Sequence, residues 1–175
     1  ARALQRIQRA GRDMEAVIDA FLILAREAEV EPQSEDFDVA DIVMDEAENA
    51  RALLLNKPVD LEVTLHARPR LHAPPRVFQV VVSNLLRNAC SYTDRGRIDV
   101  ILEPDRVIVR DTGIGMSEAT QRDLFGRFHW GDDSLTRKRS GSGLGLEISR
   151  SLARLMGGDL TARSMLGQGS VFTLY

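Results

Sequence analysis

Two asparagines inside an apolar helical segment have the residue type and the spacing to take part in chemistry. Asn84 and Asn88 lie four residues apart, so both project from one face of a helix, and Tyr92 extends that face by another turn. An amide oxygen is a neutral, hard ligand that can join a Mg²⁺ ion already carried by phosphates. Either asparagine alone is more simply explained as a cap or a local hydrogen bond. The pair is harder to explain in that way, because asparagine is a poor helix former.

A carboxylate at the end of an apolar strand is the second candidate. Asp111 closes the stretch "VIVRD" and is followed by Gly113, Ile114 and Gly115. A buried aspartate costs free energy unless a group donates to it, and an adenine amino group is a suitable donor. The glycines would let the backbone approach the base closely. The alternative is an ordinary turn, since Asp-Thr-Gly is common in turns.

The third candidate is a run of glycines directly before an apolar helix. Residues 140–146 read "SGSGLGL" and contain Gly141, Gly143 and Gly145. Glycine-rich loops that open helices bind anions, because unpaired backbone N–H groups and the helix dipole converge there. This run matches neither the P-loop pattern nor the dinucleotide-binding pattern. Taken alone, it is better explained as a mobile linker.

The elements that must position these residues begin with one long helix over residues 3 to about 29. Its apolar residues recur at spacings of three and four, which is typical of a coiled coil or a helix bundle. They are Leu4, Ile7, Gly11, Met14, Ile18, Phe21, Ala25 and Ala28. The sequence contains no second long helix for this stripe, so we expect self-association, a missing upstream helix, or both. A proline and a cluster of acids then indicate a boundary.

The remaining chain predicts a mixture of helices and strands. Asp38 is expected to cap a helix to about Leu55, and Pro75 to lie in the first turn of a helix through Tyr92. A further helix is expected at 143–158, with strands at 59–65, 97–103, 106–111, 159–164 and 170–175. The stretch 112–140 is typical of a lid, in which Phe125, Phe128 and Trp130 most simply pin the loop to a core. The sum is an α+β fold, a two-layer α/β sandwich with helices on one face of a mixed, mostly antiparallel sheet, preceded by the long N-terminal helix.

The composition argues against several other kinds of function. The chain has 175 residues and a net charge of −3, which gives no general attraction to nucleic acid or to an anionic membrane. No apolar run approaches the roughly 20 residues that a membrane span requires. The single Cys90 excludes an internal disulfide, and three scattered histidines make a structural zinc site a poor explanation.

Five motifs in this order resemble those of the ATP-binding domain of sensor histidine kinases, which has the Bergerat (GHKL) fold. "NLLRNACSYT" is similar to the N box, "DTGIGM" to the first glycine box, "LFGRFHW" to the phenylalanine box, "GSGLGL" to the second glycine box and "GQGSVFTL" to the closing glycine motif. The helix at 1–30 resembles the second helix of the family's dimerisation and phosphoacceptor hairpin. The resemblance divides the chain into that helix, a linker at 31–37 and a catalytic domain at 38–175, with a lid at about 116–142.

The resemblance implies a role for each matching position. Asn88 would be the Mg²⁺ ligand, Asn84 would lie close to the phosphates, Asp111 would bind the adenine amine and Tyr92 would lie against the base. The other nucleotide-binding residues would be Gly113, Ile114 and Gly115 at the adenine, Arg127 in the lid, and Gly141, Ser142, Gly143, Leu144 and Gly145 as lid hinge and phosphate donors.

The implied activity is transfer of the ATP γ-phosphoryl group to a histidine on the hairpin, and then to an aspartate of a response-regulator receiver domain. ATP and Mg²⁺ would be the cofactors, and the chain would form a homodimer through the N-terminal helix and its missing partner. We expect a cytoplasmic location, with membrane contact only through upstream regions. None of His66, His72 and His129 has the setting of the phosphoacceptor, so the chain is expected to be a fragment that cannot phosphorylate itself.

Two departures from the family pattern keep alternatives open. Ser91 stands where the N box usually has a lysine, and Trp130 where the phenylalanine box often ends in arginine. A degenerate, non-catalytic scaffold that binds a response regulator is therefore one alternative. Another ATPase of the same fold is the second, but such enzymes usually carry a general-base glutamate at the position of Asn84.

Overall fold

The computed structural model describes residues 33–125 and 144–175, together with six isolated helical positions nearer the N-terminus. These are Ala3, Leu4, Ile7, Gly11, Ile18 and Leu22. Most of the helix expected over residues 3–29 therefore lies outside the described residues. So does the part of the expected lid from 126 to 143, which contains Phe128 and Trp130.

The centre of the fold is one five-stranded sheet with the order β2-β4-β5-β7-β6. The strands are β2 (Val59–Leu65), β4 (Gly96–Leu102), β5 (Val107–Asp111), β6 (Leu160–Met165) and β7 (Gly169–Leu174). β2 and β4 are parallel, whereas the other neighbouring pairs are antiparallel. The expectation of a mixed, mostly antiparallel sheet is thus confirmed.

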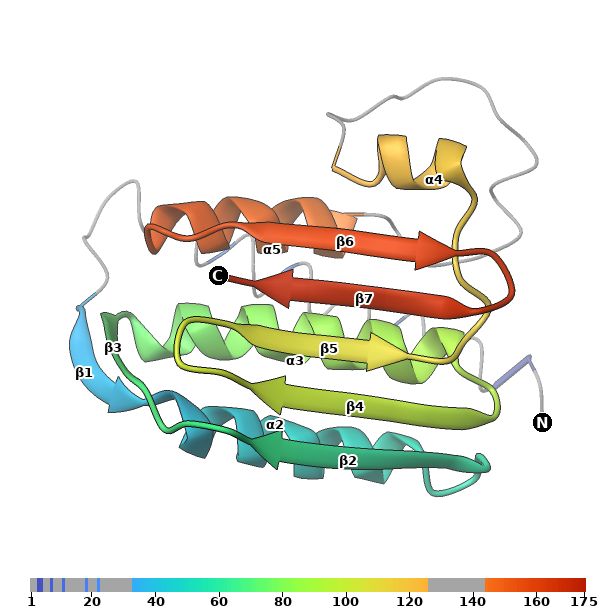
Figure 1. The fold of residues 1–175 in the computed structure, drawn as a ribbon, viewed down its shortest axis with the longest axis horizontal. Coiled ribbons are helices and arrows are strands. Elements are labelled where there is room, and N and C mark those ends of the chain that lie inside the picture. Colours follow the sequence, from blue (N-terminus) through green and yellow to red (C-terminus); the bar gives the residue numbers. More distant parts are fainter. Residues whose placement is uncertain are drawn as a thin grey trace.

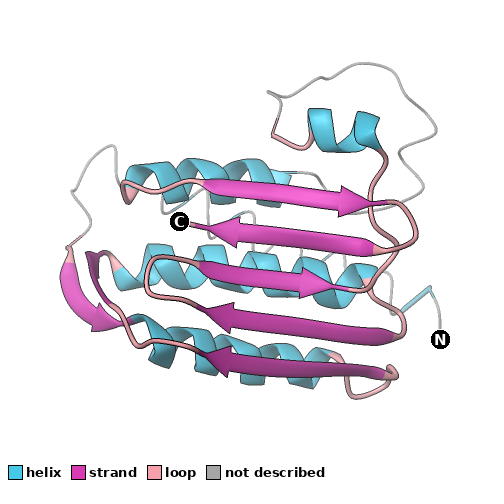
Figure 2. Ribbon diagram, viewed as in Figure 1, coloured by secondary structure: helices cyan, strands magenta, loops and turns pink. Residues whose placement is uncertain are grey.

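Three helices cover one face of this sheet (Figure 1). They are α2 (Val39–Leu53), α3 (Pro75–Tyr92) and α5 (Leu144–Leu155). As expected, Asp38 caps α2, because its carboxylate accepts from the Ala40 N–H at 2.8 Å, and Pro75 opens α3. The short helix α4 (Glu118–Asp123) lies beyond the β6 edge of the sheet. Figure 2 colours helices and strands differently, so that the helical layer and the sheet can be told apart. The two-layer α+β fold is confirmed.

The core lies between the sheet and these helices. Leu85 and Leu86 of α3 and Leu152 of α5 are buried against Ile98 of β4 and Leu160 of β6. Apolar residues of α3 recur at the three- and four-residue spacing that directs one helix face to the sheet. Asn84 interrupts this apolar segment and is itself buried. The same packing that forms the core therefore fixes the helix that carries the candidate asparagines.

A second, two-stranded sheet was not expected from the sequence. β1 (Glu35–Asp38) pairs antiparallel with β3 (Arg70–Ala73), so three residues assigned to the linker belong to a strand. Both strands are four residues long and largely polar, which leaves little periodic signal. The Phe37 and Phe78 rings, 5.5 Å apart, join this small sheet to α3.

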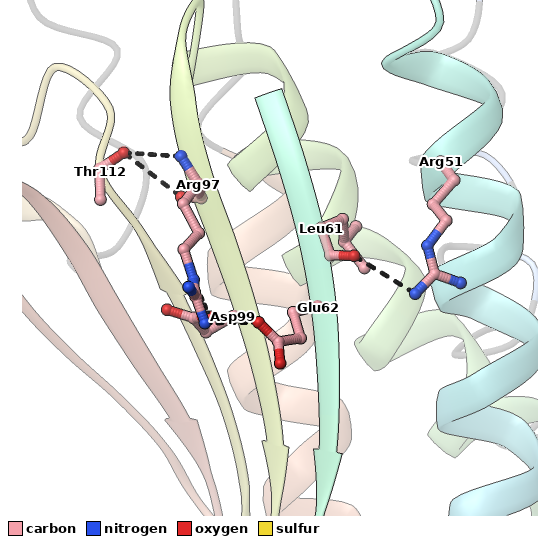
Figure 3. Close-up of polar contacts among 6 residues, drawn as sticks. All are labelled: Arg51, Leu61, Glu62, Arg97, Asp99 and Thr112. Atoms are coloured by element: carbon pink, nitrogen blue, oxygen red, sulfur yellow. Dashed lines mark hydrogen bonds and ion pairs between the residues drawn. The ribbon is translucent and has the colours of Figure 1, made fainter. Parts of the chain in front are cut away.

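Polar contacts link β2, β4 and the residue after β5 on the open face of the large sheet (Figure 3). Arg97 of β4 donates to Glu62 of β2 at 2.6 Å and to Asp99 at 2.5 Å. The Thr112 hydroxyl accepts from the Arg97 N–H at 2.9 Å, and the Thr112 N–H donates to the Arg97 carbonyl at 3.1 Å. Because Thr112 directly follows β5, this clasp holds the chain on the C-terminal side of Asp111. At the sheet edge, Arg51 of α2 donates to the Leu61 carbonyl at 3.3 Å.

Within the described part of the chain, no helix has both the length and the apolar character needed to cross a membrane.

Candidate functional site

One end of the sheet, on the right in Figure 1, gathers the candidate residues from separate parts of the chain. The C-terminal end of α3, the end of β5, the start of α5 and the hairpin between β6 and β7 all meet there. The antiparallel pairing of β5 with β7 and the packing of α3 beside α5 produce this arrangement. Segments that are tens of positions apart in the sequence therefore meet at one end of the sheet.

Asp111 is the buried charge of this site. Its side chain is 5% exposed, and its Oδ1 accepts from the Gly113 N–H at 2.9 Å. Burial raises the pKa of this carboxyl, and the backbone N–H groups of Gly113 and Ser170 only partly oppose that rise. The carboxylate thus has less hydrogen bonding than its burial requires, which is the condition for binding an external donor.

A second polar group beside Asp111 lacks a partner. The Thr93 side chain is fully buried, and its hydroxyl has no hydrogen-bond partner among the described residues. The hydroxyl lies close to the Asp111 carboxyl and lowers its pKa, although the two groups do not have the geometry of a hydrogen bond. A Cβ atom added at Gly113 would lie 2.9 Å from the Thr93 Oγ1 and 2.8 Å from the Asp111 Oδ1. Glycine is therefore needed next to these two oxygens, which lie close together at the end of β5.

The turn after Asp111 is locked to the β6–β7 hairpin. The Gly167 N–H donates to the Ile114 carbonyl at 2.7 Å, while the Ile114 side chain is 37% exposed. Gly115 has a φ of +65°, and a Cβ atom there would lie 2.0 Å from the Met165 carbonyl oxygen. Only glycine fits this conformation and this close backbone approach. The exposed Ile114 is thereby held over the open end of the sheet.

The exposed edge of β6 holds the helix α4. Gln121 of α4 donates to the Ser164 carbonyl at 2.7 Å and accepts from the Ser164 N–H at 2.9 Å. One amide side chain thus pairs with both backbone groups of an edge strand, as a neighbouring strand would. The beginning of the expected lid is fixed to the sheet by this pair.

The asparagine face of α3 has two different environments. Asn84 is 8% exposed, and its Nδ2 donates to the Ser149 hydroxyl of α5 at 3.1 Å. Asn88 is half-buried, and its side chain makes no hydrogen bond to another described residue. Tyr92, one turn further on, is 37% exposed. The face therefore runs from the Asn84 amide, fixed at the α3–α5 contact, through the half-buried Asn88 amide to the partly exposed Tyr92.

The first turns of α5 contact both sides of the site. The Ser149 hydroxyl donates to the Gly145 carbonyl at 2.6 Å within the helix. The Arg150 guanidinium lies 4.7 Å from the centre of the Phe125 ring and donates to both carboxylate oxygens of Asp159, at 2.8 and 3.1 Å. Phe125 is thus held against the helix by a cation–π contact whose cation is itself fixed.

The described residues include most of the positions singled out from the sequence. The end of the sheet brings together Asn84, Asn88, Tyr92, Asp111, Gly113, Ile114, Gly115 and the start of α5 at Leu144 and Gly145. Arg127, Gly141, Ser142 and Gly143 lie outside the described residues. Sequence reasoning missed Thr93, Gln121, Ser149 and Ser164. The available signal for Ser149 was a small polar residue among the apolar positions of a helix, which is weak by itself.

Comparison with known proteins gives this arrangement a family. Residues 73–175 match the family model described as histidine kinase-, DNA gyrase B-, and HSP90-like ATPase. Over 98% of its length the chain is 34% identical to sensor histidine kinase RppB of Synechocystis sp. and covers 39% of that protein. Over 64% of its length it is 36% identical to the signal transduction histidine-protein kinase BarA of Escherichia coli, of which it covers 14%. The chain thus spans well under half the length of both curated relatives.

Solved structures show the same fold. Full-length ShkA in complex with AMPPNP aligns with a TM-score of 0.74 and 24% identity, over 98% of this chain and 37% of that one. The cytoplasmic segment of the histidine kinase QseC aligns with a TM-score of 0.65 and 21% identity, over 92% of this chain and 91% of that one.

Proposed function

Because the chain belongs to the family of histidine kinase-, DNA gyrase B-, and HSP90-like ATPases, we propose that it is the ATP-binding catalytic part of a sensor histidine kinase. The observation that carries the proposal is the buried, under-bonded carboxylate of Asp111 beside the unpartnered Thr93 hydroxyl. These two groups fit a purine base. The amino group of adenine would donate to Asp111, and the Thr93 hydroxyl would serve a ring nitrogen directly or through water.

The remaining walls of the site fit the rest of a nucleotide. Gly113 and Gly115 allow the backbone to lie against the base, and the exposed Ile114 and Tyr92 offer apolar surface to it. Burying a base between such side chains supplies the nonspecific part of the affinity, and the carboxylate supplies discrimination for an amino-substituted purine. ADP and ATP share this portion, so both are expected to bind.

The asparagine face fits a cation carried by the phosphates. Asn88 would be the protein ligand of Mg²⁺, because its half-buried amide makes no hydrogen bond to another described residue. No group of three or more His, Cys, Asp or Glu among the described residues is placed to hold a metal ion, so the phosphates would supply most of the ligands. When bound, Mg²⁺ neutralises phosphate charge during phosphoryl transfer.

The glycine run would donate backbone N–H groups to the phosphates at the beginning of α5. In this proposal Gly141, Ser142, Gly143, Leu144 and Gly145 act as hinge and phosphate cradle, and Arg127 supplies a cation from the lid. The support is the position of Gly145 in the first turn of α5, where N–H groups and the helix dipole favour an anion. Binding at this helix end would place the triphosphate along the asparagine face of α3.

The kinase reaction itself involves the whole protein. The γ-phosphoryl group would be transferred to a histidine on the first helix of the dimerisation hairpin, and then to a receiver-domain aspartate of a response regulator. Residues 1–30 would be the second hairpin helix, joined by a linker at 31–37 to the catalytic domain at 38–175. Leu4, Ile7 and Ile18 are exposed, which supports a homodimer through this helix and its missing partner. We place these domains in the cytoplasm.

Hydrolysis of ATP to water has less support than transfer to a histidine. A water nucleophile needs a general base, and Asn84 occupies the position where hydrolytic relatives usually have a glutamate. An amide cannot accept a proton near neutral pH, and Asn84 is already hydrogen-bonded to Ser149. The site can therefore position and polarise a phosphate chain but offers no base at this position.

Calorimetric titration of ADP, with and without Mg²⁺, tests the proposal. We expect binding that strengthens with Mg²⁺, loses this Mg²⁺ dependence in Asn88→Ala and is strongly weakened in Asp111→Asn. Asn49→Ala is the matched control, because this exposed asparagine lies on α2, away from the gathered residues. Addition of the full hairpin in trans then tests the kinase step, with labelled phosphate on its histidine as the expected product. A chain that binds no nucleotide at millimolar concentration would refute the proposed function.

A further inference from the structure

The contact between α3 and α5 contains two buried polar side chains that are linked by consecutive hydrogen bonds. The Asn84 Nδ2 donates to the Ser149 Oγ at 3.1 Å, and the Ser149 Oγ donates to the Gly145 carbonyl at 2.6 Å. Asn84 is 8% exposed and Ser149 is fully buried. Hydrogen bonds between buried groups are costly to break, since water cannot replace them. This short chain of hydrogen bonds is therefore a fixed feature of the helix pair.

The direction of these hydrogen bonds determines the orientation of the amide. A serine hydroxyl has a single proton, and here that proton is directed to the Gly145 carbonyl. Toward Asn84 the hydroxyl can then only accept, so Asn84 must present its NH₂ group to Ser149. Rotating the amide by 180° would place two acceptors, the amide oxygen and the hydroxyl oxygen, against each other. The network thus selects one of two orientations that are similar in shape.

We propose that Ser149 is a positioning residue of the ATP site, which fixes Asn84 so that its amide oxygen is the atom available to the cation carried by the nucleotide. The inference rests on the proposed function. Mg²⁺ requires oxygen ligands, directly or through its bound water, and an NH₂ group directed at the cation would repel it. Asn84 lies one helical turn before Asn88, so an oxygen at this position supports the same ion from the same helix face.

The positioning role of the Ser149 hydroxyl can be tested without disturbing the packing of α5. Removing the hydroxyl leaves the Gly145 carbonyl with its helical backbone partner, since the N–H of residue 149 reaches the carbonyl of residue 145 in an α-helix. Alanine is also a better helix former than serine. Ser149→Ala should therefore fold normally while freeing the Asn84 amide to rotate.

The test measures ADP affinity of Ser149→Ala with and without Mg²⁺. We expect the strengthening by Mg²⁺ to fall about twofold, because an amide that rotates freely presents its oxygen only about half of the time, with little change in affinity when Mg²⁺ is absent. Ser151→Ala is the matched control, because Ser151 is an exposed serine on the same helix. In an Asn84→Ala background, Ser149→Ala should have no further effect on the Mg²⁺ dependence, because it acts through that amide.

A second measurement needs no ligand. In the nucleotide-free chain, the side-chain NH₂ resonances of Asn84 should shift in Ser149→Ala and stay unchanged in Ser151→Ala. Unchanged resonances, or equal losses of affinity with and without Mg²⁺, would overturn the inference while nucleotide binding by the unmodified chain still supported the proposed function. Absence of nucleotide binding in the unmodified chain would instead refute the proposed function, and the inference with it.

Discussion

Replacing Asp111 by asparagine should stabilise the unliganded chain and at the same time strongly weaken nucleotide binding. The carboxylate is 5% exposed, and burial raises its pKa despite the Gly113 and Ser170 N–H groups. Asparagine keeps an oxygen that can accept from the Gly113 N–H, now at 2.9 Å from the carboxylate. Its new NH₂ group can donate to the Thr93 hydroxyl once one of the two side chains rotates, since that hydroxyl has no hydrogen-bond partner among the described residues. The substitution thus removes a buried charge and keeps the hydrogen bond from the Gly113 N–H.

The sizes of the two effects follow from these contacts. Relief of the buried charge should raise the free energy of unfolding by on the order of 1 kcal/mol at pH 8, net of the weaker bond to Gly113. In the nucleotide complex, the NH₂ group would face the adenine amino group, so two buried donors would oppose each other. This should cost about 2–4 kcal/mol, which weakens ADP binding by a factor of roughly 30 to 1,000.

The direction in which the stability difference changes with pH tests the argument from burial. A carboxyl group whose folded pKa is raised binds more protons in the folded state, so its contribution to stability falls as the pH rises above its unfolded pKa of about 3.9. The advantage of Asp111→Asn should therefore be absent below pH 4 and develop as the pH rises. Urea unfolding between pH 3.5 and pH 8 measures this difference, and calorimetry with ADP measures the affinity.

The matched control is Asp94→Asn, the same change at a side chain that is 86% exposed, for which both quantities should remain nearly unchanged. A less stable Asp111→Asn at pH 8, or an advantage that persists below pH 4, would refute the argument from burial. Undiminished ADP affinity would refute the assignment of the adenine contact.

Three further predictions concern the backbone, the thiol and an ion pair. Gly115→Ala should lower the free energy of unfolding in urea by about 3 kcal/mol or more, against about 1 kcal/mol for Gly167→Ala. Both glycines have a positive φ, but the new Cβ would lie 2.0 Å from a backbone oxygen at Gly115 and would meet nothing within 4 Å at Gly167, so equal losses would contradict this reason. Burial raises the pKa of Cys90 to about 11, so a thiol reagent at pH 8 should label it only as the chain unfolds, and rapid labelling of the folded chain would contradict its burial. The hydrogen bond from Arg150 lowers the pKa of Asp159, so Asp159→Asn should lower the free energy of unfolding by about 1 kcal/mol at pH 7. This loss of stability should disappear as the pH falls through the acidic range below about 4, which thermal unfolding at each pH would measure.

Most of the fold could be predicted because its elements carry local signals. The residues of 59–65 alternate in exposure as they alternate in polarity, and Asp38 and Pro75 begin helices where cap and proline chemistry require it. The pairing of β1 with β3 could not be predicted in the same way. Each of these strands is four residues long, and each depends on a partner more than 30 positions away.

The site could be predicted at the level of residue types, and less well at the level of contacts. The spacing of Asn84 and Asn88 correctly indicates a shared helix face, but nothing in it shows that Asn84 is buried against a serine 65 positions later. Likewise, the run from Asp111 to Gly115 indicates a constrained turn, while the need for glycine at its end depends on the β6 backbone. Such contacts are set by how elements pack, which a single sequence encodes only indirectly.

Consecutive residues of α5 connect the two sides of the site through different physical interactions. Ser149 faces α3 and acts through a buried hydrogen bond, whereas Arg150 faces Phe125 and acts through its charge, which Asp159 holds in place. Neighbouring residues on a helix point about 100° apart, so one short helix can contact α3 and the start of the lid without either side chain displacing the other. Asp159, which follows α5 in the chain, orients Arg150 through two hydrogen bonds, so no residue of the lid is needed to do so. The hold on Phe125 is therefore part of the folded domain itself, and nucleotide binding at the first turn of α5 would act on a helix already attached to both sides.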